Sequence, residues 1–247
     1  MSTDPAVLFA APCIVFAACT VFGITGFGSA LISIPLLAHF LPLDTIVPLM
    51  VLVDFSAACS SGLRDRHVVD RGEVRSVLPM IGVGVVAGVL MLKQLPGEWL
   101  LVALGIFVTG YGLHGLARGR PLRAAPGWLA HPAGFLGGLL GAMFGIGGPI
   151  YVMYFGSRIH DTARLRATLS VVFSLSTGMR IAMFVVSGLL LDWHLWLAAL
   201  GLLPMMFAGT ALGRRIHLHL SRQQVLRTMG VLLVASGASL LVRGLAL

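Results

Sequence analysis

Residues 22–35 read FGITGFGSALISIP, a run apolar enough to lie within a membrane but poor in residues that sustain a regular helix. The positions that disfavour a helix here are Gly23, Thr25, Gly26 and Gly28. A second, similar run follows at residues 144–150, which read FGIGGPI. Glycine weakens a helix and proline interrupts one. Both runs therefore predict a helix that breaks inside a hydrophobic segment.

The composition of the whole chain indicates a membrane protein. Of its 247 residues 57% are hydrophobic and only 11% are charged, and the mean hydropathy is +0.96; soluble domains carry about 25% charged residues. Apolar segments lie at 6–40, 45–63, 76–92, 98–117, 132–156, 167–190, 193–213 and 224–242. Most are close to the roughly 18–25 residues that a helix needs to cross a bilayer. We expect an all-α polytopic membrane protein.

The chain matches itself at a nearly constant offset. Phe-Gly-Ile at 22–24 recurs 122 residues later at 144–146, and Leu-Pro-Met at 78–80 recurs 125 residues later at 203–205. Each copy of the second match is followed by a glycine pair: Gly84 and Gly88 in the first half, Gly209 and Gly213 in the second. Pairs with this spacing are typical of close helix packing. Ordered matches of this kind predict two repeats.

The arginines indicate how the two repeats are related. We expect repeats at 1–123 and 130–247, joined by a linker at 124–129, within one membrane domain. Thirteen arginines lie in the connections: Arg64, Arg66, Arg71, Arg75, Arg118, Arg120, Arg123, Arg158, Arg164, Arg166, Arg214, Arg215 and Arg222. They follow the second and fourth segments of the first repeat but the first and third of the second. Because basic loops face the cytoplasm, the repeats are predicted to be inverted, with six to eight crossings in all. Each repeat would hold one discontinuous or re-entrant element, broken at its glycines, and three spanning helices.

A broken helix at membrane depth needs a physical reason. It exposes backbone N–H and C=O groups, which are tolerated only inside protein or beside water. Inverted repeats with discontinuous helices are typical of secondary transporters, whose half-helix N-termini face the substrate. Gly147, Gly148 and Pro149 predict such a start, since proline suits the first helical position. A helix N-terminus favours anions. We interpret the breaks as an anion site; the alternative is that their glycines only allow close packing.

Charged and polar residues within the spans add candidates. Arg180 lies near the middle of segment 167–190 and could hold an oxyanion with its planar guanidinium group, or it could form a structural ion pair with Asp54. Asp54 could instead carry a coupling proton. The candidate substrate-binding residues are Gly23, Thr25, Gly26, Gly28, Ser29, Gly145, Gly147, Gly148, Tyr151, Ser176 and Arg180, with Asp54 as a coupling or ion-pair residue.

Other classes of function find little support in the sequence. His217 and His219 form an HxH pair without a third ligand nearby, so no metal site is predicted. No P-loop, HExxH motif or paired acid and base is present, so we expect neither an enzyme nor a bound cofactor. The net charge of +8 is spread over short loops beside apolar segments. This distribution fits anionic lipid rather than nucleic acid.

With their flanking residues, the two glycine-rich runs read GITGFGSALISIP and GLLGAMFGIGGPIYVMYF. Together with the short basic loops, they resemble the sulfite exporter TauE/SafE family over nearly the full length. The resemblance implies a multi-pass permease of the bacterial inner (plasma) membrane. It also implies a small anion as substrate, such as sulfite, sulfoacetate or a related organosulfonate, usually moved outward.

Two classes of function follow from these observations. The first is a secondary transporter that works by alternating access, with a small anion and the lipid bilayer as partners and a homodimer as a candidate assembly. The second is a non-transporting membrane subunit for assembly or partner docking. In that alternative the breaks serve only to pack helices, and no anion is bound.

Overall fold

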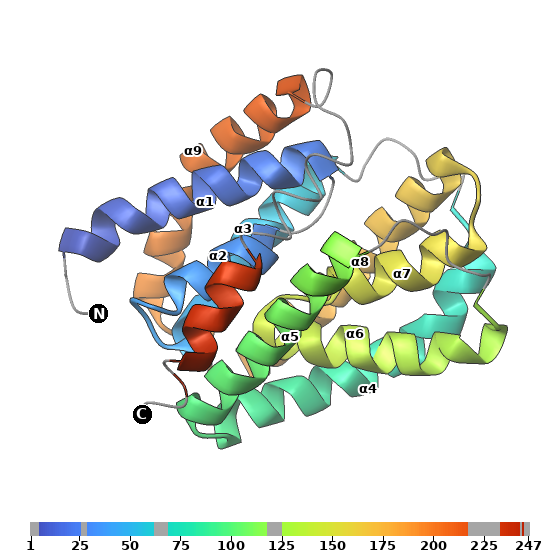
Figure 1. Cartoon of the computed structure of the whole chain (residues 1–247), viewed down its shortest axis with the longest axis horizontal. Helices are drawn as coiled ribbons and strands as arrows, with labels where there is room; N and C mark the ends of the chain where they lie inside the picture. The colour runs from blue at the N-terminus through green and yellow to red at the C-terminus, as the bar shows by residue number, and fades with distance from the viewer. Residues whose placement is uncertain are drawn as a thin grey trace.

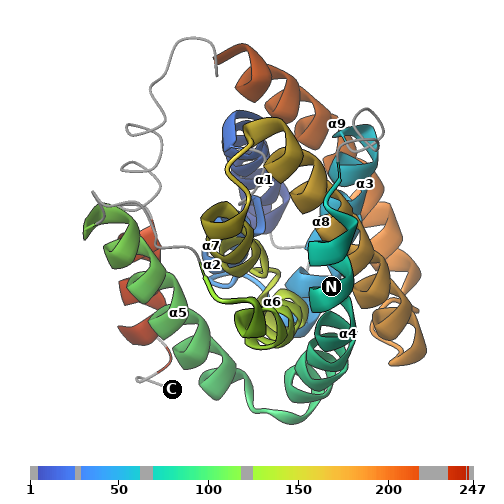
Figure 2. The same cartoon turned by 90° about the vertical axis from the view of Figure 1, so that its right-hand side faces the viewer.

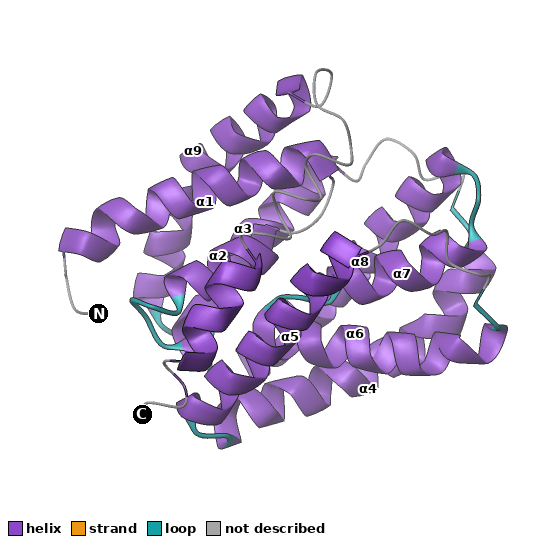
Figure 3. Cartoon of the chain, viewed as in Figure 1, coloured by secondary structure: helices purple, strands orange, loops and turns teal. Residues whose placement is uncertain are grey.

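The computed structural model describes residues 5–25, 29–61, 69–117, 125–216, 233–242 and 244. Within these ranges the chain consists of helices and short connections, with no strand (Figure 3). The helices are α1 (Pro5–Thr25), α2 (Ser29–Leu37), α3 (Leu43–Ser61), α4 (Arg71–Gln94), α5 (Gly97–Ala117), η2 (Gly127–Leu129), α6 (Ala130–Phe144), α7 (Gly148–Arg158), α8 (Thr162–Val186) and α9 (Trp193–Ile216). A further helical segment spans Leu233–Val242. The predicted all-α class is confirmed for this part of the chain.

Three stretches are long and apolar enough to cross a membrane: Arg71–Gln94, Ala167–Val186 and Trp193–Gly213. Shorter apolar helical stretches lie at Ala10–Ile24, Gly97–Leu113 and Leu233–Val242. Many large apolar side chains are exposed, as a lipid-facing surface requires; Val186, for example, is 81% exposed. The membrane class is therefore supported by length, composition and surface. Residues 224–232 of the last expected segment lie outside the described residues.

The second glycine-rich segment divides into two helices, and the first holds one described helix on each side of its glycines. In the second segment α6 ends at Phe144 and α7 begins at Gly148, which confirms the predicted break. In the first segment α1 and α2 lie on either side of residues 26–28, which are outside the described ranges. Helix α2 has 9 residues and α7 has 11. At 1.5 Å per residue they extend for only about half of a bilayer.

The helices pack in matching pairs. Helix α1 runs along α9, and α6 runs along α4 (Figure 1). Helix α3 contacts both α8 and α9, while α8 contacts both α3 and α4. The C-terminal segment lies beside α5 (Figure 2), where a Cβ added at Gly105 would meet Leu241. The short helices α2 and α7 lie inside this frame. Both carry large, fully buried side chains: Leu31 and Ile34 on α2, and Tyr151 and Phe155 on α7.

The glycine pairs lie where long helices touch most closely. A Cβ added at Gly84 would overlap the carbonyl oxygen of Phe135 on α6, and one at Gly88 would lie 2.5 Å from that of Leu139. A Cβ at Gly209 would lie 2.5 Å from the carbonyl oxygen of Phe16 on α1. The packing role expected for these glycines is confirmed, because no side chain fits between the backbones.

We expect Gly209→Val to loosen the contact between α1 and α9. The added side chain must displace backbone atoms of α1, and overpacking of this kind costs about 1–3 kcal/mol. Thermal unfolding of the detergent-solubilised protein should therefore shift to lower temperature. Gly201→Ala, also on α9, is the matched control, because no atom lies within 4 Å of its added Cβ. Equal unfolding temperatures for the two variants would contradict the packing role.

Candidate functional site

The C-terminal end of α6 is shaped by Gly145. This residue has φ of 69°, in the left-handed region that glycine adopts without strain. Its amide donates to the carbonyl oxygen of Gly141 at 2.9 Å, and the amide of Ile146 donates to that of Leu140 at 3.2 Å. These bonds satisfy carbonyls at the end of α6 and turn the chain back on itself.

Helix α7 then begins without a side-chain cap. Gly147 precedes its first residue, no side chain accepts from its first turn, and Pro149 occupies that turn. A Cβ added at Gly147 would overlap the carbonyl oxygen of Gly137 on α6. The absence of a side chain thus lets the start of α7 lie directly against α6. Uncapped N–H groups at such a start favour a negatively charged ligand.

The two broken segments meet at this turn. A Cβ added at Gly145 would lie 2.5 Å from Ile34 Cδ1 and 3.0 Å from Ala30 Cβ, both on α2. The same Cβ would lie 3.7 Å from Arg180 Nη2 on α8. One added at Gly141 would lie 3.7 Å from the backbone of Gly147 and 3.8 Å from Arg180 Cδ. Helix α2, the turn between α6 and α7, and Arg180 therefore form one cluster.

Arg180 is buried, with only 5% of its surface exposed. Among the described residues, its Nε and Nη2 atoms have no hydrogen-bond partner. A charged group held inside a membrane protein without a partner is costly, and such groups are usually paired or functional. The guanidinium group therefore has donors free for an acceptor that the described residues do not supply.

Asp54 on α3 lies close to this cluster but does not neutralise Arg180 directly. Ser29, the first residue of α2, donates from Oγ to Asp54 Oδ1 at 2.6 Å. Within the described part of the chain, no ion pair of 4 Å or less joins Asp54 to Arg180, although the two charges are close enough to interact electrostatically. Ser29 and Asp54 thus form a hydrogen-bonded pair near the Arg180 guanidinium group.

Tyr151 and Ser176 complete the buried polar surroundings. The Tyr151 hydroxyl lies 3.3 Å from Ser176 Oγ, joining α7 to α8. The Tyr151 ring packs edge-on against Phe173, with 5.9 Å between ring centroids. Both hydroxyls are buried, and Ser176 precedes Arg180 by one helical turn. Ser176 therefore lies on the side of α8 that faces α7.

The remaining candidates from the first segment are placed differently. Gly23, near the end of α1, packs against α9, where a Cβ added at Gly213 would lie 2.9 Å from its Cα. Thr25 ends α1, but its side chain is outside the described residues, as are Gly26 and Gly28 altogether. Sequence reasoning missed Gly141, although it precedes Gly145 by one turn within the same glycine-rich run.

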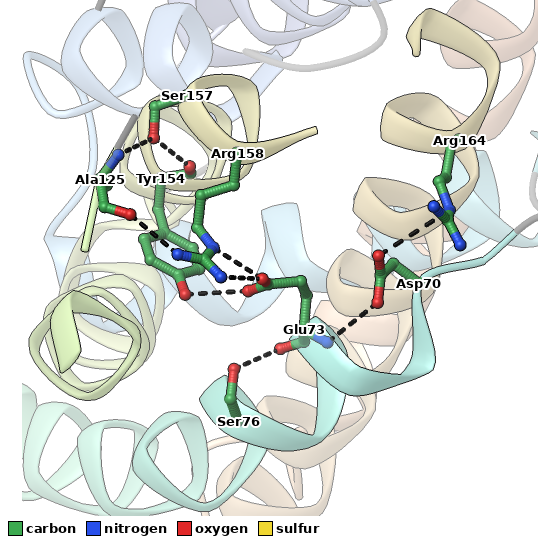
Figure 4. A network of polar contacts seen from close by, with 8 residues as sticks. All are labelled: Asp70, Glu73, Ser76, Ala125, Tyr154, Ser157, Arg158 and Arg164. Atoms are coloured by element: carbon green, nitrogen blue, oxygen red, sulfur yellow. Dashed lines mark hydrogen bonds and ion pairs between the residues drawn. The ribbon is translucent and has the colours of Figure 1, made fainter. Parts of the chain in front are cut away.

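A polar network ties the far end of α7 to the start of α4 (Figure 4). Arg158 donates from Nε to Glu73 Oε1 at 2.6 Å and from Nη1 to the Ala125 carbonyl oxygen at 2.8 Å. The Tyr154 hydroxyl donates to Glu73 Oε2 at 2.9 Å, so it serves this network rather than the turn. Nearby, Asp70 and Arg164 form a looser pair at 3.8 Å.

We expect Glu73→Gln to destabilise the protein by about 1–2 kcal/mol, because it weakens the charge-assisted bond to a partly buried Arg158. A double-mutant cycle with Arg158→Gln, read by thermal unfolding, should give a favourable coupling energy of similar size. Asp192→Asn is the control. Both side chains of the Asp192–His194 pair are exposed, so the pair should contribute no measurable stability. Additive single effects would show that the two side chains are not coupled.

Apolar spans, two divided segments and a buried polar cluster where these segments meet define a polytopic helical membrane protein. The sequence profile of the family described as Sulfite exporter TauE/SafE matches residues 11–240. The chain belongs to this family, whose members are transporters rather than enzymes.

Two curated relatives support this assignment. The chain is 34% identical over 194 residues to "Probable inner membrane transporter protein TsaS" of Comamonas testosteroni, covering 78% of this chain and 81% of the relative. It is 27% identical over 225 residues to "Probable sulfite/organosulfonate exporter TauE" of Cupriavidus necator, covering 88% and 87% respectively. No solved structure matches the chain significantly.

Proposed function

We propose that the protein is a secondary transporter that exports sulfite, sulfoacetate or related organosulfonates across the bacterial inner membrane by alternating access. The family and the name of the Cupriavidus necator relative support this class of substrate, and the name of the Comamonas testosteroni relative supports an inner-membrane transporter. The single observation that carries the proposal is the burial of Arg180 where α2 meets the turn between α6 and α7, with two donors that have no partner among the described residues.

The proposed site suits a small oxyanion. A guanidinium group can donate two parallel hydrogen bonds to a sulfite or sulfonate group. The N–H groups at the start of α7 add donors and a partial positive charge. Glycine at positions 145 and 147 lets α2 and α6 lie directly against this turn, and glycine at position 148 would let the anion approach the backbone closely. Tyr151 and Ser176 would add hydroxyls, and Ser29 would line the opposite side. We assign Thr25, Gly26 and Gly28 to the same site from their place in the sequence.

We also propose that residues 1–123 and 130–247 are inverted repeats joined by the linker 124–129. The reciprocal packing supports this relation: α1 lies on α9 as α6 lies on α4, and α3 contacts α9 as α8 contacts α4. Exchanging each helix for its repeat equivalent reproduces the most extensive of the helix contacts. Two such halves could rock about a site between them and open it to each side in turn.

Export follows from the charge of the substrate. When the membrane potential is negative inside, moving an anion out of the cytoplasm is favourable by about 2.3 kcal/mol per charge per 100 mV. Asp54 would act as the coupling group, since its carboxylate accepts a hydrogen bond from Ser29 and interacts electrostatically with Arg180. A proton taken up there would reduce repulsion between the carboxylate and the bound anion.

Counterflow in proteoliposomes tests the proposal. Vesicles preloaded with unlabelled sulfite should accumulate radiolabelled sulfite against its gradient, and vesicles without protein should not. Sulfoacetate, taurine, thiosulfate and sulfate, added as competitors, would rank the substrates. Failure of folded protein to accumulate any anion of this panel would favour a non-transporting membrane subunit instead.

A further inference from the structure

A cavity of about 420 Å³ opens where α4 and α8 begin, away from the Arg180 cluster. Its apolar walls are Val69, Val74, Val171 and Leu175. Arg71 and Arg75, one turn apart on α4, also line the cavity, and both are exposed. The cavity thus combines an aliphatic wall with two cationic side chains.

The two arginines carry charge that the described residues do not neutralise. The acidic residues closest to them in sequence are already engaged: Asp70 with Arg164 and Glu73 with Arg158. Neither Arg71 nor Arg75 has a carboxylate within 4 Å in the described ranges. On the α8 side, Ser174 donates to the carbonyl oxygen of Ser170 at 2.8 Å, so its hydroxyl proton is engaged as well. Among the described residues that line the cavity, the arginines therefore remain as its unpaired cationic donors.

The position of the cavity matches the headgroup level of a bilayer. The spanning stretches start at Arg71 on α4 and at Ala167 on α8. At 1.5 Å per residue, the lining residues of both helices lie within about 12 Å of those starts. A basic pocket between membrane helices at this depth suits an anionic lipid headgroup, with the aliphatic wall facing the first part of the acyl chains. Leu175 is 38% exposed, as expected at a border with lipid.

We propose that this cavity binds one anionic phospholipid, whose phosphodiester is held by Arg71 and Arg75 and whose acyl chains lie against Val74, Val171 and Leu175. The bound lipid would supply the negative charge that the described residues do not place beside Arg71 and Arg75. The site is separate from the proposed transport site, and its assignment does not depend on the transported anion.

Native mass spectrometry of the full-length protein tests the proposal directly. Purified protein in detergent is titrated with phosphatidylglycerol, with phosphatidylcholine of the same acyl chains, and with glycerol phosphate as a soluble headgroup. We expect one phosphatidylglycerol per chain at low lipid concentration, bound about tenfold more tightly than phosphatidylcholine. Glycerol phosphate should not compete at equal concentration, because it lacks the chains that the aliphatic wall would hold.

Arg71→Gln combined with Arg75→Gln should abolish this preference. Replacement of both by lysine should preserve part of it, because the charge remains but the paired donors of each guanidinium are lost. The matched control is Lys93→Gln with Arg215→Gln, which removes two charges elsewhere and should leave lipid binding unchanged. Retention of the single tight phosphatidylglycerol by the Arg71/Arg75 glutamine variant would overturn the proposal. Equal binding of both lipids would also overturn it, and competition by glycerol phosphate would assign the cavity to a soluble anion instead.

Discussion

An Arg180→Gln protein is expected to bind and transport sulfite at least about 100-fold less well than the wild type. Hydrogen bonds to a charged group contribute about 1.5–3 kcal/mol each, and glutamine cannot replace a bidentate pair. Every 1.4 kcal/mol corresponds to a factor of ten in affinity. Sulfite counterflow measures transport, and calorimetry on the purified protein measures the dissociation constant.

The same substitution should leave the fold intact or stabilise it. Arg180 is buried and its Nε and Nη2 have no partner among the described residues. Removing a buried charge that no described carboxylate pairs directly relieves a desolvation cost, which we expect to exceed the loss of its longer-range attraction to Asp54. Unfolding temperature without ligand should therefore stay the same or rise, while the stabilisation that sulfite gives should disappear. A purely structural arginine predicts the opposite: lower stability and little change in the substrate preference of the protein that remains folded.

Two comparison variants sharpen this experiment. Arg180→Lys keeps the charge but loses the planar pair of donors, so we expect transport between that of the wild type and that of the glutamine variant. Arg215→Gln removes an exposed arginine near the end of α9 and should transport normally. Normal sulfite transport by Arg180→Gln, inserted at wild-type level, would remove Arg180 from the mechanism.

The class of the protein and the positions of its helices could be predicted from local patterns. A hydrophobic run of sufficient length specifies a membrane helix whatever lies elsewhere in the chain. Gly145 and Pro149 interrupt such a run by their own backbone properties, so the break between α6 and α7 is a local feature. These predictions needed no knowledge of which helices touch.

The set of residues that form the candidate site was harder to predict from the sequence, because it depends on contacts between distant parts of the chain. Ala30 and Ile34 on α2 pack against Gly145, and no spacing rule connects them. Tyr151 and Tyr154 follow the same break, yet the helical rotation between them sends one hydroxyl to Ser176 and the other to Glu73. Glu73 itself gave no sequence signal, since one acidic residue in a first helical turn is ordinary.

Gly147→Ala is expected to reduce sulfite transport on the order of 100-fold, although it adds a single methyl group. Gly147 has ordinary helical backbone angles, so alanine causes no conformational strain there. The added Cβ would instead overlap the Gly137 carbonyl oxygen, which belongs to the backbone of α6 and cannot move aside freely. The start of α7 must shift by on the order of 1 Å, and displacements of this size in a preorganised site are costly.

Gly156→Ala is the matched control, because it lies on the same helix, is exposed, and has no atom within 4 Å of its added Cβ. Alanine there should stabilise α7 by roughly 0.5–1 kcal/mol and leave transport unchanged. For Gly147→Ala, overpacking should cost about 1–3 kcal/mol of stability, and sulfite affinity should fall in the protein that remains folded. If Gly147→Ala lost stability but kept wild-type affinity for sulfite, the close approach of α7 to α6 would serve packing alone. The N-terminus of α7 would then have no part in holding the anion.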